Sequence, residues 1–288
     1  MKTNHYKKTS FSRLILSSAK FVLLASFSGA FSIEAEPATE DNVTANKLVE
    51  ISALDSSSSS DSDSSSWNFL KPYIANYSFF LDKDKLGQSI RTFSRDDQHW
   101  EIDTNTIAKK FIINLKSKEN SKFHIKDGLL VNDQFVSYSK RTFKKVKDTK
   151  QVFDWKTKVE TGHRNKKKWQ LPLQSQVFDR VSHLIQLRAD LLEGKAVFNY
   201  PVSHKGKIHA YIYQFDKTEI IKTKMGDLVA QKYVRTKSNG AKFVIWLSPA
   251  LEYLAVKISQ SKKDSPEVTL LLESIEYTER PKIVRTES

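Results

Sequence analysis

The feature that most constrains the fold of this 288-residue chain is a two-residue alternation of apolar and polar side chains. It begins at Tyr73–Leu81 and recurs in short segments as far as Tyr277. The segments are rich in β-branched and aromatic residues and end at turn residues, which is the pattern of β-strands. The further strands that we expect span residues 88–94, 100–102, 111–115, 123–126, 129–138, 152–156, 196–202, 208–215, 219–223, 228–235, 243–247, 253–260 and 268–277. In the strand at 88–94 we expect Ile90 on the inner face, and the Ser-Asn-Gly sequence at 238–240 predicts a hairpin turn.

One segment breaks this alternation. Between Ser175 and Leu192 the apolar residues Val177, Val181, Leu184, Ile185 and Leu192 recur at helical spacing and form one stripe, and Gly194 follows as a stop signal. Such a helix has to bury its apolar stripe, and the concave face of a curved sheet is the expected place. The predicted fold class is therefore mainly β: an antiparallel curved sheet or partly open barrel with one central amphipathic helix packed on the concave face.

The first 66 residues differ in composition from the rest. Residues 1–35 combine a basic start, a short apolar core at Phe21–Phe31 and small residues near the end, which is typical of a cleaved signal peptide. That core is short against the roughly 20 residues that span a bilayer. Residues 36–66, with the run DSSSSSDSDSSS, predict a disordered Ser/Asp-rich linker. We therefore expect a periplasmic protein with a single β-rich domain over residues 67–285 and no integral membrane span after signal removal.

Several kinds of chemistry are excluded by what the sequence lacks. The chain has no cysteine, which excludes disulfide scaffolds, thiolate zinc sites and thiol nucleophiles. It has no Gly-x-Ser-x-Gly nucleophile elbow and no glycine-rich phosphate loop. Asp179 and His183, four residues apart on the predicted helix, could form an acid–base or metal pair. We nevertheless expect no metal site and no cofactor, because ligand-like spacing is missing from the other histidines considered, His99, His124, His163, His204 and His209.

The order of several short motifs resembles a known family. These motifs are Asp179–Arg188 (DRVSHLIQLR), Gly226 at the opening of a strand, Trp246–Pro249 (WLSP) and Tyr253–Val256 (YLAV). Together they resemble the exported bacterial proteins known as the domain of unknown function 3108 family, over about residues 72–278. One departure is Ala255, where the family tends to have proline. The resemblance implies export and an antiparallel, partly open barrel, and it supplies no catalytic residues.

The folded part of the chain is strongly basic. After residue 66 there are 41 Lys and Arg against 25 Asp and Glu, and two dense clusters lie at residues 141–150 and 164–168. Export and the bias to lysine argue against nucleic acid, whose recognition favours arginine. The clusters therefore indicate either a solvated lysine-rich edge or attraction to anionic envelope material such as lipid head groups, lipid A phosphates or acidic glycans.

Aromatic residues are numerous enough to line a cavity or to fill the core beneath the helix. The polar helix residues either tie the helix to the sheet or face a ligand. The residues that we single out as a binding set are Tyr77, Trp100, Trp155, Asp179, Arg188 and Trp246.

These observations favour a non-enzymatic binding or accessory factor in cell-envelope maintenance, with a lipophilic or anionic partner. Two alternatives stay open. One is a hydrolase that acts on envelope polymers through Asp179 and His183. The other is an interaction protein that adds an exposed strand edge to a partner sheet. The identity of the partner and the oligomeric state do not follow from the sequence.

Overall fold

The computed structural model describes residues 67, 70–96, 98–173, 176–237 and 239–278. The predicted signal peptide and linker, and the end of the predicted domain after residue 278, lie outside these residues. Helix α1 spans Ser182–Leu192, and a 3-10 turn η1 spans Pro249–Leu251. The described strands are β1 (Tyr73–Leu81), β2 (Asp84–Arg95), β3 (Trp100–Lys110), β4 (Ile113–Lys126), β5 (Leu129–Arg141), β6 (Lys147–Asp154), β7 (Val159–Arg164), β8 (Lys167–Pro172), β9 (Phe198–His204), β10 (Lys207–Thr223), β11 (Gly226–Thr236), β12 (Lys242–Ser248), β13 (Leu254–Lys262) and β14 (Ser265–Tyr277).

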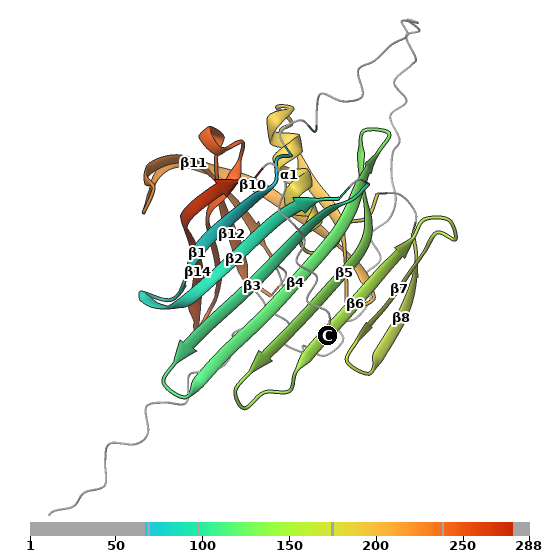
Figure 1. Ribbon diagram of the computed structural model, residues 1–288, viewed down its shortest axis with the longest axis horizontal. Helices are drawn as coiled ribbons and strands as arrows, with labels where there is room; N and C mark the ends of the chain where they lie inside the picture. The colour runs from blue at the N-terminus through green and yellow to red at the C-terminus, as the bar shows by residue number, and fades with distance from the viewer. Residues whose placement is uncertain (1–66, 68–69, 97, 174–175, 238, 279–288) are drawn as a thin grey trace, which may run out of the picture.

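All described strands belong to one antiparallel sheet. Its order runs from β8 to β1 and then from β14 to β9, so β1 pairs with β14 and the two ends of the domain meet in the middle of the sheet. The sheet curves around an interior that holds α1 towards one end (Figure 1). This arrangement confirms the predicted fold class, an antiparallel, partly open barrel with one helix inside. No described helix has the length and hydrophobicity that are needed to cross a membrane.

The open edges of the sheet, β8 and β9, are linked by side chains. Gln151 of β6 donates from Nε2 to Ser203 Oγ in β9 over 3.1 Å. The Trp169 ring of β8 lies so close to Gly206, in the β9–β10 turn, that a Cβ added there would be 2.9 Å from it. Gly206 and Lys205 both have positive φ, which a two-residue hairpin turn between His204 and Lys207 requires.

The core follows the alternation that the sequence predicts, with local exceptions. In β1, alternate side chains from Tyr73 to Leu81 are buried, as expected. In β2 the phase is opposite to the prediction: Ile90 is half-buried, while Arg91 and Phe93 lie inside. The guanidinium of Arg91 lies 5.7 Å from the Tyr77 ring centroid, within the range of a cation–π contact. The strand predicted at residues 111–115 starts later, because Phe111 has positive φ and forms the β3–β4 turn.

The sequence predicts a helix from Ser175, but helix α1 begins at Ser182. The preceding segment is extended instead: Phe178 pairs in parallel with Val202 of β9, and its nitrogen donates to the Pro201 carbonyl over 2.9 Å. Val177 is buried in this segment rather than on the helix, and Leu192, predicted on the buried stripe, is 41% exposed. The polar residues of the helix are buried together with the apolar ones, so the amphipathic pattern does not divide a wet face from a dry face.

Candidate functional site

The start of α1 is held by the carboxylate of Asp179, which is fully buried. It accepts hydrogen bonds from the nitrogens of Val181 (2.6 Å) and Ser182 (2.9 Å), and from Ser121 Oγ of β4 (2.6 Å). Ser182 Oγ accepts in return from the Asp179 nitrogen over 3.0 Å. Burial raises the pKa of the Asp179 carboxyl, and these hydrogen bonds oppose that rise. Asp179 therefore anchors the helix start to the sheet.

His183 is the second polar anchor of the helix. Its Nδ1 lies 3.1 Å from the Asp179 backbone oxygen, and its Nε2 lies 2.9 Å from the Tyr213 hydroxyl of β10. A carbonyl can only accept, so Nδ1 carries the proton and Nε2 accepts from the Tyr213 hydroxyl. Burial, helped by the charge of Arg235, lowers the pKa of His183 to about 3. The ring is thus neutral, and it meets the backbone of Asp179 rather than its carboxylate.

A buried ion pair completes the attachment of the helix to the sheet. Arg180 Nη2 donates to Glu119 Oε1 of β4 over 2.7 Å, and both side chains are almost wholly buried. The guanidinium also lies 5.2 Å from the centroid of the Phe135 ring in β5. At the far end of the helix, Arg188 donates from Nε to the Glu252 carbonyl over 3.1 Å. Helix and sheet are therefore joined by polar contacts at both ends of α1.

The residues predicted as a binding set lie in separate places. Tyr77 is buried, and its hydroxyl donates to the Ala255 carbonyl over 2.9 Å. Trp100 is stacked on Phe93, with ring centroids 5.0 Å apart. Trp155 is half-buried and donates to the Asn132 carbonyl over 2.6 Å. These contacts place the first three residues in the packing of the sheet.

Trp246 of β12 lies among charged side chains, whereas the preceding residue, Ile245, faces the interior. The ammonium groups of Lys257 and Lys232 lie 4.5 Å and 5.6 Å from its ring centroid, and its indole nitrogen donates to Glu219. Ile245, next to it, lines the interior cavity described below. Of the six predicted residues, Arg188 alone is among those that line that cavity. A binding role for the set stays a prediction.

The interior cavity beside α1 is small. It measures about 20 Å³ and lies between the helix, at Leu184 and Arg188, and the sheet, at Tyr73, Arg91 and Ile102. A space of this size holds about one water molecule. Ligand pockets for organic molecules are typically about 300–1,000 Å³. The side chains of α1 and of the sheet therefore pack together and leave no room there for an organic ligand.

A much larger cleft lies where the two basic clusters of the sequence meet. It measures about 680 Å³ and is lined by residues from the end of β5, the β5–β6 loop, the start of β6, the end of β7 and the β7–β8 turn. Antiparallel pairing of β6 with β7 places Thr149 opposite Arg164 and so brings the two clusters together. The described residues that line it include six bases and no acid: Arg141, Lys144, Lys145, Lys147, Arg164 and Lys166. We call this the basic cleft.

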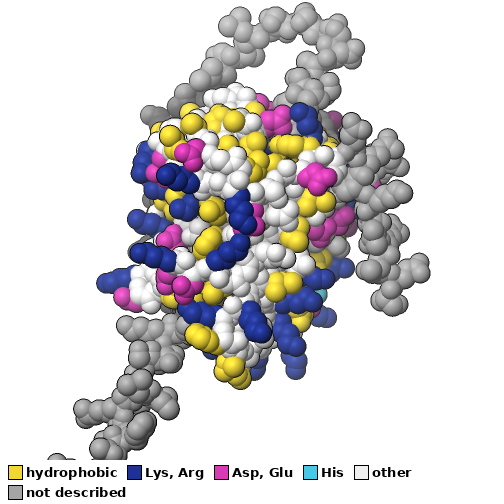
Figure 2. All heavy atoms as spheres, turned by 60° about the vertical axis from the view of Figure 1, so that its left-hand side comes forward, with side chains coloured by type: hydrophobic (Ala, Val, Ile, Leu, Met, Phe, Trp, Pro, Cys, Tyr) yellow, Lys and Arg dark blue, Asp and Glu magenta, His cyan; other side chains and the backbone are white. Residues whose placement is uncertain are grey.

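The electrostatics of the basic cleft are those of crowded like charges. Half-burial lowers the pKa of Lys147, and the charges of Arg164, Arg141, Arg180 and Lys144 lower it further. Burial also lowers the pKa of Arg141. On the face shown in Figure 2, by contrast, lysines and arginines are spread among acidic, polar and hydrophobic side chains. The cleft is a local concentration of positive charge, and an anion would relieve it.

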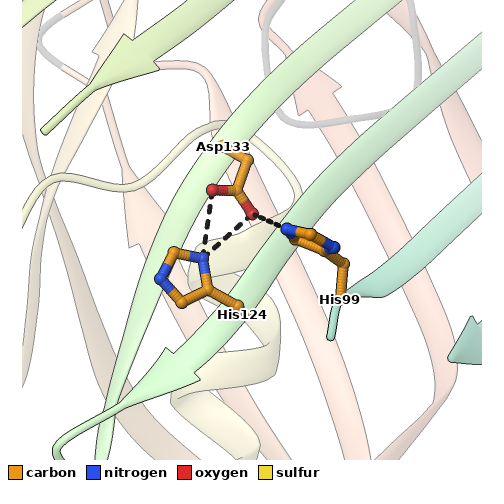
Figure 3. A group of neighbouring side chains, drawn as sticks. All are labelled: His99, His124 and Asp133. Atoms are coloured by element: carbon orange, nitrogen blue, oxygen red, sulfur yellow. Dashed lines mark hydrogen bonds and ion pairs between the residues drawn. The ribbon is translucent and has the colours of Figure 1, made fainter. Parts of the chain in front are cut away.

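Sequence reasoning missed one cluster of potential ligands. His99, His124 and Asp133, which the sequence separates, each offer a ligand atom within 4.8 Å of the others (Figure 3). The spacing of the histidines along the chain predicts no metal site, because that spacing does not show which residues lie close together in the folded sheet. A two-residue repeat says nothing about strand register, and register is what brings these residues together.

Comparisons with known proteins give a family and a fold. The model of the family described as "Protein of unknown function (DUF3108)" matches residues 74–272. No curated protein matches the chain. Among solved structures, the chain is similar to a beta-barrel-like protein of the domain of unknown function DUF1849 from Brucella abortus, with a TM-score of 0.50 and 11% identity over 73% of this chain and 98% of that one. At that identity the likeness concerns the fold alone.

Proposed function

The chain belongs to the DUF3108 family of proteins of unknown function, and we propose that it is an exported, non-catalytic binding protein of the bacterial periplasm. It holds an anionic component of the cell envelope, through phosphate groups, in the basic cleft. The observation that carries this proposal is the convergence of six basic residues, from two clusters distant in sequence, on one cleft of about 680 Å³.

Phosphate is the chemistry that suits this cleft best. The lining bases are mostly lysines, which bind phosphate as point charges, and the two arginines can bind two phosphate oxygens at once. A ligand with several negative charges would also favour the charged form of Lys147, whose pKa is lowered by burial and by neighbouring cations. The cleft volume lies within the usual range for small-molecule sites.

The geometry gives less support to the other functions that the sequence left open. A lipophilic ligand under the helix would have to fit a cavity of about 20 Å³. A hydrolase built on Asp179 and His183 would need their side chains exposed to substrate, and both are buried and engaged with the sheet. These contacts support a structural role for the helix and direct the search for a ligand to the basic cleft.

The test compares two probes that share phosphate chemistry. Binding of inorganic pyrophosphate is measured by calorimetry, and binding to vesicles of phosphatidylglycerol mixed with phosphatidylcholine is measured by sedimentation. Wild-type protein should bind at least one of them, more weakly as salt is added. Binding to both indicates a general phosphate site, and binding to vesicles alone indicates a lipid head group.

The variant Lys145→Gln/Lys147→Gln should weaken binding by about 2- to 30-fold, since a charge pair at the protein surface contributes about 0.2–1 kcal/mol. The matched control is Lys222→Gln/Lys263→Gln, which removes the same charge from exposed positions in the other half of the sheet. It should bind like the wild type. The proposal is wrong if the wild type binds neither probe, or if the control pair weakens binding as much as the cleft pair.

A further inference from the structure

The cluster of His99, His124 and Asp133 lies on the outer side of the sheet, and none of the three is among the residues that line the basic cleft. His124 Nδ1 is 3.0 Å and 3.1 Å from the two carboxylate oxygens of Asp133, and His99 Nε2 is 3.9 Å from Asp133 Oδ2. The two imidazole rings are 5.9 Å apart and nearly perpendicular. Each of the three side chains is about 30% exposed. The three groups therefore converge on one point that solvent can reach (Figure 3).

Strand pairing explains the meeting of the two histidines. His99 directly precedes β3, and His124 lies in β4. Trp100 is opposite Phe123 in the antiparallel register, so the histidines next to this pair come to lie side by side. Both side chains are half-exposed, while Trp100 and Phe123 are buried. Tryptophan and phenylalanine thus fix the inner face, and the histidines occupy the outer one.

A β-bulge brings the carboxylate to the histidines. In the β4–β5 pair, Lys122 is opposite Gln134 while the next residue, Phe123, is opposite Asn132, so Asp133 is the extra residue. Asn132 is fully buried, whereas both Asp133 and Gln134 are half-exposed. A bulge breaks the two-residue alternation and re-aims a side chain. Here it turns Asp133 towards His124.

The other side of His99 is already held by a second carboxylate. Asp96 Oδ1 lies 3.4 Å from His99 Nδ1 and also accepts from the His99 backbone nitrogen over 2.6 Å. Its other oxygen, Oδ2, is 3.3 Å from Lys122 Nζ. Metal-binding histidines usually donate their second ring nitrogen to such a carboxylate, which fixes the tautomer and the ring orientation. Asp96 therefore leaves Nε2 of His99 as the nitrogen that faces Asp133.

We propose that His99, His124 and Asp133 bind a divalent transition-metal ion such as Zn²⁺ or Cu²⁺, with Asp96 as the outer partner of His99. Two imidazoles and one carboxylate suit these metals, whereas Mg²⁺ and Ca²⁺ prefer oxygen ligands. Bonds of about 2.0–2.2 Å to a tetrahedral metal place its ligand atoms about 3.4 Å apart. The ligand atoms of the three residues lie within 4.8 Å of one another, so small side-chain rotations would bring them to that spacing. The remaining positions face solvent and are open to water or to a ligand carried by a partner.

The experiment uses the whole chain, first stripped of metal with a chelator. Calorimetry with Zn²⁺ alone should show one ion bound per chain. His124→Gln and Asp133→Asn should each weaken that binding by more than about tenfold, and Asp96→Asn, which keeps an acceptor oxygen, by about tenfold. The matched control is His163→Gln, which removes a half-exposed histidine from β7. It should leave binding unchanged.

A spectroscopic measurement separates metal ligation from a structural role of the same residues. The paramagnetic resonance spectrum of bound Cu²⁺ should show coupling to two imidazole nitrogens, and to one in His124→Gln. Circular dichroism should show that each variant keeps the wild-type fold. The proposal is overturned if the folded wild type binds no Zn²⁺ or Cu²⁺, if His163→Gln weakens binding as much as His124→Gln, or if the spectrum lacks imidazole coupling.

Discussion

The neutral state of His183 gives the protein a predictable sensitivity to acid. The pKa of His183 is lowered from 6.5 to about 3 by burial, by Arg235 and by Arg180, against the opposing hydrogen bond to the Asp179 carbonyl. The unfolded chain takes up a proton below its own pKa of 6.5, and the folded chain does not until about pH 3. Stability from this group is therefore full above the unfolded pKa and is lost as the pH falls towards the folded value.

The size of the effect follows from these two pKa values. Between about pH 7.5 and about pH 5, protonation of the unfolded chain at this histidine costs the folded state about 2 kcal/mol. The variant His183→Gln cannot take up that proton. It loses packing against Tyr211, whose ring centroid is 5.1 Å from that of His183, so it is less stable at both pH values. Its loss of stability between the two pH values should nevertheless be smaller than that of the wild type by about 2 kcal/mol.

Urea unfolding at the two pH values measures this difference directly, provided that the slope against urea is the same for both proteins. Comparing each protein with itself cancels the lost packing. Subtracting the loss of the variant from the loss of the wild type then cancels the contribution of other groups that titrate, such as His204, whose pKa is also lowered by burial. The reasoning is refuted if the two proteins lose equal stability between the two pH values, or if nuclear magnetic resonance shows His183 titrating near pH 6.5 in the folded state.

Two further predictions concern the barrel itself. Arg180→Leu should destabilise the protein by about 3–5 kcal/mol in urea unfolding, because it breaks the buried ion pair with Glu119 by removing one of its two charges; the double variant Glu119→Leu/Arg180→Leu should recover most of that loss, and a single variant as stable as the wild type would contradict this. Gly87→Ala should cost about 1–3 kcal/mol and lower the melting temperature, because the added Cβ would lie 2.0 Å from the Ile107 carbonyl oxygen of β3; an unchanged melting temperature would show that the strands move apart freely.

The sequence predicts the strands well where one face is buried and the other is wet. In β1 the buried alternation is visible in the residues themselves, and the Asn239–Gly240 pair predicts the hairpin between β11 and β12. The alternation of apolar and polar residues predicts the wrong face where a polar side chain is buried on the inner face. In β2 the side chain of Arg91 is buried on the inner face, so the prediction that the apolar Ile90 marks the inner face is wrong.

The start of the helix is also predicted wrongly, because a contact with a distant strand decides it. Val177 continues the apolar spacing towards the N-terminus, but the backbone at Phe178 pairs with β9. That tertiary contact outweighs local helical spacing. The Asp179 carboxylate accepts hydrogen bonds from the backbone nitrogens of Val181 and Ser182, and these bonds fix where the helix begins.

Both candidate sites depend on register and could not be predicted from composition. The sequence shows two basic clusters, but only the pairing of β6 with β7 places them on one cleft. The metal ligands depend on the pairing of β3 with β4 and on a bulge at Asp133. A single extra residue in one strand decides which face a side chain occupies, and it leaves no trace in the hydrophobic pattern.

Amide hydrogen exchange, followed residue by residue with and without inorganic pyrophosphate, tests most directly whether ligand binding takes place at the basic cleft and not beneath the helix. Pyrophosphate should slow exchange at residues 141–147 and 164–166, and α1 should exchange slowly whether or not pyrophosphate is present. Slowing confined to α1 and the strands beneath it, with no change at the cleft, would contradict binding there.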